Sequence, residues 1–354
     1  MSIFNNSSAN DSLVGIDLGL SVIKIVELKK ENDVPRLVTF GISTDEGQNE
    51  ISMPGDKVPS NLNDLMRQAR TTTERVVGAL PATSVFSTIV ELPNMSPKEV
   101  NSAIQWEVKK LVPLPIEKMS LNWHILPGPE VTEAKKESTQ KIKVINNAAP
   151  KDTTKEYLDT FKKADLKLIG LETEIKALQR ALLTPQDNTT LIVDIGATNT
   201  SLIVFDKTLP LLTKNVEIGG STLTNNIANS MNISYASADS NKLNMGLSTD
   251  SQADHPAVRA LKFSIDNILI REIRYLSTIL RNSNNKNIDK IILTGGTAKM
   301  KNLDKYLEQE LKINTELGDP WQKIQYPQGI REELEEIGPK MAVAVGLALK
   351  IFEK

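Results

Sequence analysis

Residues 14–27 read VGIDLGLSVIKIVE, a stretch that predicts two buried strands joined by a tight turn. Apolar residues lead into Asp17, Gly19 lets the backbone turn sharply, and a β-branched run follows Ser21. Because an acid is costly inside a core, we expect Asp17 at the edge of the sheet, facing a cleft. Such a turn presents backbone N–H groups and a hydroxyl to an anion, and Lys24 adds a charge. On its own, this stretch is equally compatible with an ordinary hairpin.

The same pattern recurs about half a chain later, where residues 191–205 read LIVDIGATNTSLIVF. The matched pairs are Asp17 with Asp194, Gly19 with Gly196, and Ser21 with Thr198. A strand, an acid, a turn and a hydroxyl that open each half of the chain indicate an internal duplication. The repeat therefore favours a functional role for both turns over two unrelated hairpins.

Composition excludes several classes of function. The chain has 354 residues, with 42 basic and 44 acidic side chains and a formal net charge of -2, a balance that argues against nucleic-acid binding. The sequence contains no cysteine, which excludes disulfides and cysteine-ligated metals. His124 and His255 lie far apart in sequence, so neither a histidine-rich metal site nor a Ser-His-Asp triad is expected.

The sequence also bears on location. No apolar run reaches the roughly 18–20 residues of a membrane span. Residues 1–12 are polar and rich in Asn and Ser, so we expect a disordered tail and not a signal peptide. These features predict a cytoplasmic protein, and they leave attachment to a membrane through a partner open.

Residues 80–165 have a character of their own. Strand, helix, strand, strand and helix patterns follow one another there, and Ser96–Glu99 reads as a capping box that opens the first helix. Val100, Ile104 and Val108 form an apolar stripe along that helix. This block is interpreted as a subdomain inserted between two pieces of a larger domain, and the alternative is that it continues the first domain.

Further glycine pairs stand at Gly219-Gly220, before a helix, and at Gly295-Gly296, after a strand. Neither a P-loop nor a dinucleotide fingerprint is present. Two acid-bearing hairpins and later glycine turns suit a nucleotide held between two lobes. Nearer the end of the chain, residues 256–281 predict one long helix, 313–337 show little periodicity, and 339–352 predict a buried terminal helix.

The order of these turns resembles that of the actin, Hsp70 and sugar-kinase superfamily. The closer resemblance is to the PilM family of type IV pilus assembly proteins, which is related to the cell-division protein FtsA. The matching stretches are 15–24, 194–198, 218–224, 238–242, 292–296 and 344–348, together with Ala79-Leu80-Pro81, Gln105-Trp106-Glu107 and Val112-Pro113-Leu114-Pro115 in the inserted block. The resemblance extends over residues 14–352.

The resemblance implies an α/β protein with the actin-like ATPase fold, in which two ribonuclease-H-like lobes surround a nucleotide cleft, with an FtsA-like inserted 1C subdomain. The first lobe would comprise residues 13–79 and 166–188, the inserted subdomain 80–165, and the second lobe 189–354. Within the second lobe, a smaller 2B part would span about 231–285.

The resemblance also implies a site for ATP and Mg²⁺. The phosphate-binding residues would be Gly19, Leu20, Ser21, Lys24, Gly196, Ala197, Thr198 and Asn199. The nucleoside-binding residues would be Gly219, Gly220, Asp239, Lys242, Gly295, Gly296, Thr297 and Met300, with Asp239 shorter than the glutamate usual in the family. Asp17 and Asp194 would hold Mg²⁺ through water. Glu172 and Glu174 lie where the superfamily often has a water-positioning acid, although a helix N-terminus favours acids in any case.

The function implied is that of a cytoplasmic, ATP-binding scaffold with at most weak ATPase activity. It would hold the short cytoplasmic tail of a PilN-like inner-membrane protein near the inserted subdomain, sit on the inner face of the membrane through that partner, and connect it to the pilus motor ATPases. Self-association is left open. Val100 and Ile104 belong either to the groove for the tail or to the core. An FtsA-like division protein and a small-molecule kinase of the superfamily are the alternatives; the first needs an amphipathic anchor after a linker, and the sequence ends directly after a helix of buried type.

Overall fold

The structure is a computed structural model, and it describes residues 11–43, 55–111, 114–126, 141–247 and 254–353. The predicted N-terminal tail lies outside these ranges except for its last two residues, and the first strand already begins at Ser12. The described part of the chain contains no helix that is long and apolar enough to cross a membrane.

The chain divides into two compact units. The smaller unit comprises residues 80–160, and the larger unit comprises residues 1–79 together with 161–354. The finer division of the larger unit into two lobes at residues 188 and 189 stays a prediction.

The larger unit contains a sheet built around the first hairpin. Its strands lie in the order β3-β2-β1-β4-β8. They are β1 (Ser12–Leu18), β2 (Ile23–Glu31), β3 (Val34–Ile42), β4 (Arg75–Leu80) and β8 (Lys167–Thr173). The first three strands pair antiparallel, and β4 pairs parallel with β1. The helix α1 (Val58–Ala69) packs against β3 through an apolar face that includes Leu62 and Leu65.

A second sheet in the same unit repeats this topology, as the matched hairpins predict. Its order is β11-β10-β9-β12-β13, with β9–β10–β11 antiparallel and β12 parallel to β9. The strands are β9 (Thr189–Ile195), β10 (Thr200–Asp206), β11 (Leu209–Val216), β12 (Lys290–Thr294) and β13 (Asn314–Leu317). The sequence did not predict β13, because it is four residues long and buries Thr315 alone.

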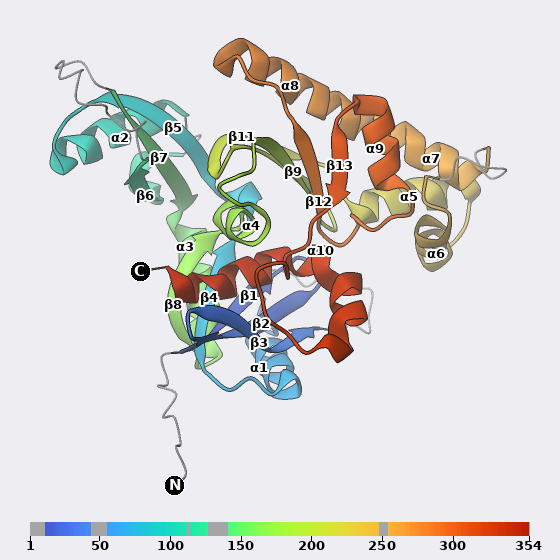
Figure 1. Cartoon of the computed structure of the whole chain (residues 1–354), viewed down its shortest axis with the longest axis horizontal. Helices are drawn as coiled ribbons and strands as arrows, with labels where there is room; N and C mark the ends of the chain where they lie inside the picture. Colours follow the sequence, from blue (N-terminus) through green and yellow to red (C-terminus); the bar gives the residue numbers. More distant parts are fainter. Residues whose placement is uncertain (1–10, 44–54, 112–113, 127–140, 248–253, 354) are drawn as a thin grey trace, which may run out of the picture. The chain divides into compact units, whose positions relative to one another are not determined.

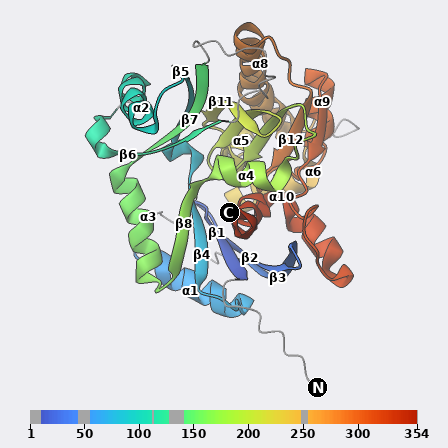
Figure 2. The same ribbon diagram turned by 60° about the vertical axis from the view of Figure 1, so that its left-hand side comes forward.

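The helix α10 (Arg331–Ala348) packs against β1, β2 and α4 (Glu174–Leu182), as Figures 1 and 2 show. Two glycines allow this close packing. A Cβ atom on Gly15 would lie 2.1 Å from the Ala344 carbonyl oxygen, and one on Gly346 would lie 1.9 Å from that of Ala177. The prediction that this helix begins at Pro339 is wrong, because α10 begins eight residues earlier and contains the proline. A short 3₁₀ turn (Leu349–Phe352) follows it.

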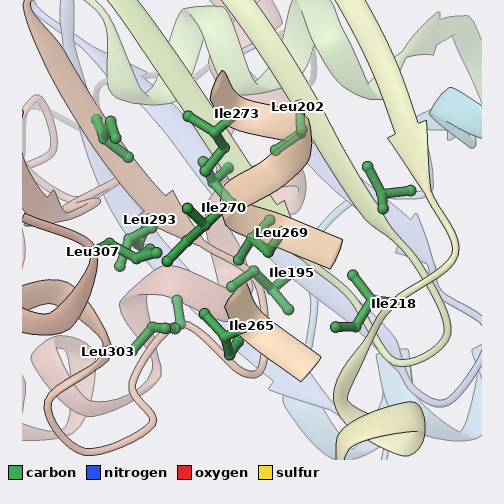
Figure 3. Close-up of a cluster of buried hydrophobic side chains, with 14 of the residues drawn as sticks. Ile195, Leu202, Ile218, Ile265, Leu269, Ile270, Ile273, Leu293, Leu303 and Leu307 are labelled. Carbon is green, nitrogen blue, oxygen red and sulfur yellow. The ribbon is translucent and has the colours of Figure 1, made fainter. Parts of the chain in front are cut away.

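The second sheet is accompanied by α5 (Gly220–Met231), α6 (Tyr235–Met245), α7 (Pro256–Ser264), α8 (Arg271–Asn284) and α9 (Leu303–Leu311). A π-helical segment (Ile265–Ile270) joins α7 to α8, so the predicted long helix is continuous but irregular. Leu269 and Ile270, which are adjacent in this segment, are both buried in the same core. Figure 3 shows both pointing into one apolar cluster with Ile195 and Leu293.

The smaller unit is a three-stranded antiparallel sheet with one helix on its apolar face. The sheet order is β5-β7-β6. The elements are β5 (Phe86–Pro93), α2 (Pro97–Leu111), β6 (Met119–Ile125), β7 (Lys141–Pro150) and α3 (Lys151–Lys163). Val100, Ile104 and Val108 are buried in the core of this unit with Val144, so the apolar stripe is core and not an open groove. At the start of α2, Glu99 accepts hydrogen bonds from the backbone N–H and the hydroxyl of Ser96.

Candidate functional site

The first turn carries a buried ion pair. Asp17 and Lys24 are direct neighbours across β1 and β2, and Lys24 Nζ lies 2.7 Å from Asp17 Oδ2. Burial by itself would lower the pKa of Lys24, but the negative charges of Asp17, Asp194 and Glu174 raise it above its ordinary value. Lys24 is therefore a fixed positive charge beside the turn.

Gly19 is needed for space and not for an unusual backbone angle. A Cβ atom there would lie 2.9 Å from the Val22 carbonyl oxygen and 3.4 Å from Lys24 Nζ. Leu20, at the tip, is 44% exposed, and Ser21 is half-buried. The turn therefore holds its backbone close to the lysine while its tip stays accessible.

The second turn has the same shape but no cation. Gly196 N–H donates to the Asn199 carbonyl oxygen at 2.9 Å and closes the turn after Asp194. Ser201 lies opposite Asp194, where Lys24 lies opposite Asp17 in the first turn. Burial raises the pKa of Asp194 to about 6, with Asp17 adding to the rise and Lys24 opposing it. Lys24 thus forms an ion pair with Asp17 and acts on Asp194 only through its charge.

Of the two glutamates, Glu174 is the one whose charge acts on this cluster. It is the first residue of α4, and its charge contributes to the raised pKa of Lys24. Glu172 is engaged elsewhere, because its carboxylate forms ion pairs with Lys350 and, at 2.9 Å, with Arg180 Nη2.

The glycine pair before α5 packs against the second turn. Gly220 N–H donates to the Gly196 carbonyl oxygen at 2.9 Å, and Ser221 N–H donates to that of Ala197 at 2.8 Å. A Cβ atom on Gly219 would lie 2.5 Å from the Ala197 oxygen. These glycines therefore let the start of α5 approach the turn, and the nucleoside contact expected of them stays a prediction. Thr198 and Asn199, in the same turn, are half-buried.

Lys242 reaches the start of α5 from α6. Its ammonium group donates to Asp239 Oδ1 at 2.6 Å, to Thr224 Oγ1 at 2.8 Å and to the Gly220 carbonyl oxygen at 3.3 Å. Burial would raise the pKa of Asp239, but the hydrogen bonds from Lys242 and Thr224 keep it below the ordinary value. The Asp-x-x-Lys segment thus forms a polar cluster with α5, in which Lys242 is buried and Asp239 is half-buried.

The turn after β12 completes the arrangement. Gly295 has a φ of +89°, and a Cβ atom there would lie 2.5 Å from Asp194 Oδ1, so glycine is required on both counts. Gly296 faces open space, since nothing lies within 4 Å of its Cβ position. Thr297 lies beside Gly220, whereas the side chain of Met300 is buried in the hydrophobic core.

Thr294 and Pro339 also hold this turn, and neither was predicted as a site residue from the sequence. Thr294, which is fully buried, donates through its hydroxyl to the Pro339 carbonyl oxygen at 2.6 Å, and Gly295 N–H donates to the same oxygen at 3.0 Å. The carbonyl belongs to α10, which packs on the first sheet. Because proline is disfavoured inside a helix but favoured at its first position, the sequence predicts that the last helix begins at Pro339, and this contact is not visible in it.

The arrangement suits an anion accompanied by a hydrated divalent cation. Two backbone turns, one lysine and two aspartates converge, and the Gly296 side is open. Among the described residues, no group of three or more His, Cys, Asp or Glu side chains could hold a metal ion. Mg²⁺ is commonly held by one or two carboxylates with water and substrate phosphates, and the pair Asp17 and Asp194 fits that donor set.

Comparison with known proteins shows similarity over almost the entire chain. A family model described as type IV pilus assembly protein PilM matches residues 15–352. A solved structure of a PilM-PilN type IV pilus biogenesis complex is 26% identical, covers 97% of this chain and 99% of that chain, and superposes with a TM-score of 0.82. The resemblance to this family predicted from the sequence is therefore confirmed.

More distant structures share the fold. The ethanolamine utilization protein EutJ from Carboxydothermus hydrogenoformans is 15% identical, with a TM-score of 0.55, over 96% of this chain and 89% of that chain. MreB5 of Spiroplasma citri, bound to ADP, is 14% identical, with a TM-score of 0.52, over 98% and 97%. These matches confirm the predicted actin-like fold, while the FtsA-like character of the inserted subdomain stays a prediction.

Proposed function

This chain belongs to the PilM family of type IV pilus assembly proteins, and from that premise we propose that it is an ATP-binding scaffold for a PilN-like inner-membrane protein. The observation that carries the proposal is the match to a PilM-PilN complex, which extends over nearly the full length of both chains. The partner would present its short cytoplasmic tail, and through it the scaffold would lie at the inner face of the cytoplasmic membrane. We further propose a connection to the pilus motor ATPases.

The partner is tested by direct binding. A fluorescent peptide with the cytoplasmic tail sequence of the PilN-like protein is titrated with the full chain, and its anisotropy is followed. We expect saturable binding of the native peptide and none of a scrambled peptide of the same composition. Equal binding of the two peptides, or no saturable binding of either, would overturn this part of the proposal.

The nucleotide would lie against the two matched turns. The amides of residues 19–21 and 197–199 and the charge of Lys24 would bind the phosphates, since the Gly196 N–H already donates to the Asn199 carbonyl oxygen. The open side of Gly296 would receive the nucleoside. Asp17 and Asp194 would hold Mg²⁺ through water. Since the charge of Lys24 is already paired with Asp17, a divalent cation would supply the remaining compensation for bound phosphates.

Thermal unfolding with and without Mg·ATP tests this site. A ligand at about 100 times its Kd stabilises by about 2.7 kcal/mol, which corresponds to about 5 °C in Tm for a unit of this size. We expect that shift in the parent protein and its loss in Asp17→Asn and Asp194→Asn. Asp206→Asn is the matched control, because Asp206 pairs with Lys286 at the far end of β10. A parent protein that shows no shift would refute ATP binding.

A further inference from the structure

Lys242 is a buried cation whose hydrogen-bonding capacity is fully used inside the protein. An ammonium group carries three N–H donors, and Lys242 Nζ lies within 3.3 Å of three acceptors on Asp239, Thr224 and Gly220. The residue is 7% exposed. A lysine in this state has no donor left for a ribose or a base.

The place that Lys242 occupies is electrostatically unfavourable for α5. The first turn of a helix carries the positive end of its dipole, where cations destabilise and anions stabilise. Asp239 compensates the charge, but its side chain is 38% exposed, and an ion pair that is open to solvent on one side contributes little to stability. The position is therefore better explained by what Lys242 holds in place than by the stability of the helix.

What Lys242 holds is the first residue of α5. The Gly220 carbonyl accepts from the lysine, and the Gly220 and Ser221 N–H groups donate to the carbonyls of Gly196 and Ala197. The first N–H groups of a helix lack partners within the helix, so they are free to fix a neighbouring backbone. In the first turn of α5, the Gly220 carbonyl is thus held by Lys242, and the Gly220 and Ser221 N–H groups hold the second turn of the site.

We propose that Lys242 is a positioning residue that, together with Asp239, holds the first turn of α5 and through it the phosphate-binding shape of the turn 196–199. It does not contact the nucleoside. This inference rests on the proposed ATP binding, and it assigns the Asp-x-x-Lys segment to the phosphate end of the ligand. Affinity for any polyphosphate then depends on Lys242, whereas preference for the nucleoside does not.

Calorimetric titration of the full chain with ATP and with inorganic tripolyphosphate separates the two roles. In Lys242→Met we expect both affinities to fall by the same factor, roughly tenfold or more, because small misplacements of binding groups are costly. The ratio of the two dissociation constants should stay that of the parent. A selective loss of ATP affinity with unchanged tripolyphosphate affinity would assign Lys242 to the nucleoside and overturn the proposal, as would two unchanged affinities.

Hydrogen exchange supplies a readout that needs no ligand. The Gly220 and Ser221 amides should exchange faster in Lys242→Met. Without the lysine, the first turn of α5 is no longer held against the carbonyls of Gly196 and Ala197. Lys290→Met is the matched control, since Lys290 is likewise an ion-paired lysine, with Asp187 at 2.8 Å and Glu316 at 3.2 Å, and it lies at the other end of β12. We expect it to lower Tm without changing exchange at 220–221 or either affinity.

The outcomes separate the inference from the function on which it rests. A parent protein that binds neither ATP nor tripolyphosphate refutes the proposed function, while the exchange rates at 220–221 still decide whether Lys242 holds the turn. Unchanged exchange in Lys242→Met refutes the positioning role even if ATP binds. If Lys242→Met does not fold, Asp239→Asn keeps the shape, removes the compensating charge, and is expected to change the same two amides and the same two affinities.

Discussion

Replacing Gly346 by alanine sets two physical effects against each other. Alanine is favoured over glycine inside a helix by about 1 kcal/mol, so helix propensity alone predicts a more stable protein. The new Cβ, however, would lie 1.9 Å from the Ala177 carbonyl oxygen and 2.5 Å from its carbon, so α4 and α10 must separate. The contact of Arg180 with the Gly346 carbonyl is then disturbed as well. Because overpacking costs about 1–3 kcal/mol or more, we expect a net loss of about 2 kcal/mol.

Urea unfolding followed by circular dichroism measures this difference. The control is Gly329→Ala, because nothing lies within 4 Å of that Cβ position. The free energy of unfolding of the control should equal that of the parent or exceed it by up to about 1 kcal/mol, since alanine restricts the unfolded chain. A Gly346→Ala protein as stable as the control would refute the reasoning that close helix packing, and not helix propensity, selects glycine at this position.

Three further perturbations probe the site. The raised pKa of Asp194, about 6 against about 4 in an unfolded chain, means that the parent loses stability as the pH rises from about 4 to about 6; Asp194→Asn should therefore have a free energy of unfolding about 2–3 kcal/mol above that of the parent at about pH 7 and nearly the same as the parent at about pH 4, and a pH-independent difference would contradict this. Lys24→Met leaves the buried Asp17 uncompensated and should lower the free energy of unfolding in urea by about 3 kcal/mol. Adding Asp17→Asn to the same chain should restore more than half of that loss, and strictly additive losses would disprove the coupling. Thr294→Val removes a buried hydrogen bond to Pro339 and should cost about 1–2 kcal/mol in the same assay, whereas an unchanged midpoint would show that the bond contributes nothing.

The parts of the site that depend on neighbouring residues can be predicted from the sequence. The pairing of Asp17 with Lys24 follows from a short turn between two strands, because alternation and turn length fix which side chains face each other. The likeness of the two halves is visible for the same reason. Local pattern is sufficient there, since each hairpin forms from one continuous stretch.

The parts that depend on packing between distant segments cannot be predicted in this way. The contact of Gly219 and Gly220 with the turn 196–199, against which α5 begins, is not visible in the local sequence. Glu172 reads as a site acid, and nothing local reveals that Arg180 and Lys350 bind its carboxylate. The early start of α10 is hidden for a similar reason, because Pro339 breaks helices in isolation, whereas the contacts of α10 with β1, β2 and α4 stabilise this one.

The first hairpin carries a lysine at the position where the second carries a serine, and this difference affects the orientation of a bound ligand. A site lined by two copies of one motif offers an elongated ligand two equivalent directions, related by the symmetry of the halves. Lys24 removes that equivalence, because Ser201 opposite Asp194 is neutral and its hydroxyl already contacts the Asn215 side chain. The charged end of a ligand then has one preferred pole, and a single substitution between the duplicated halves is sufficient to give the site a direction.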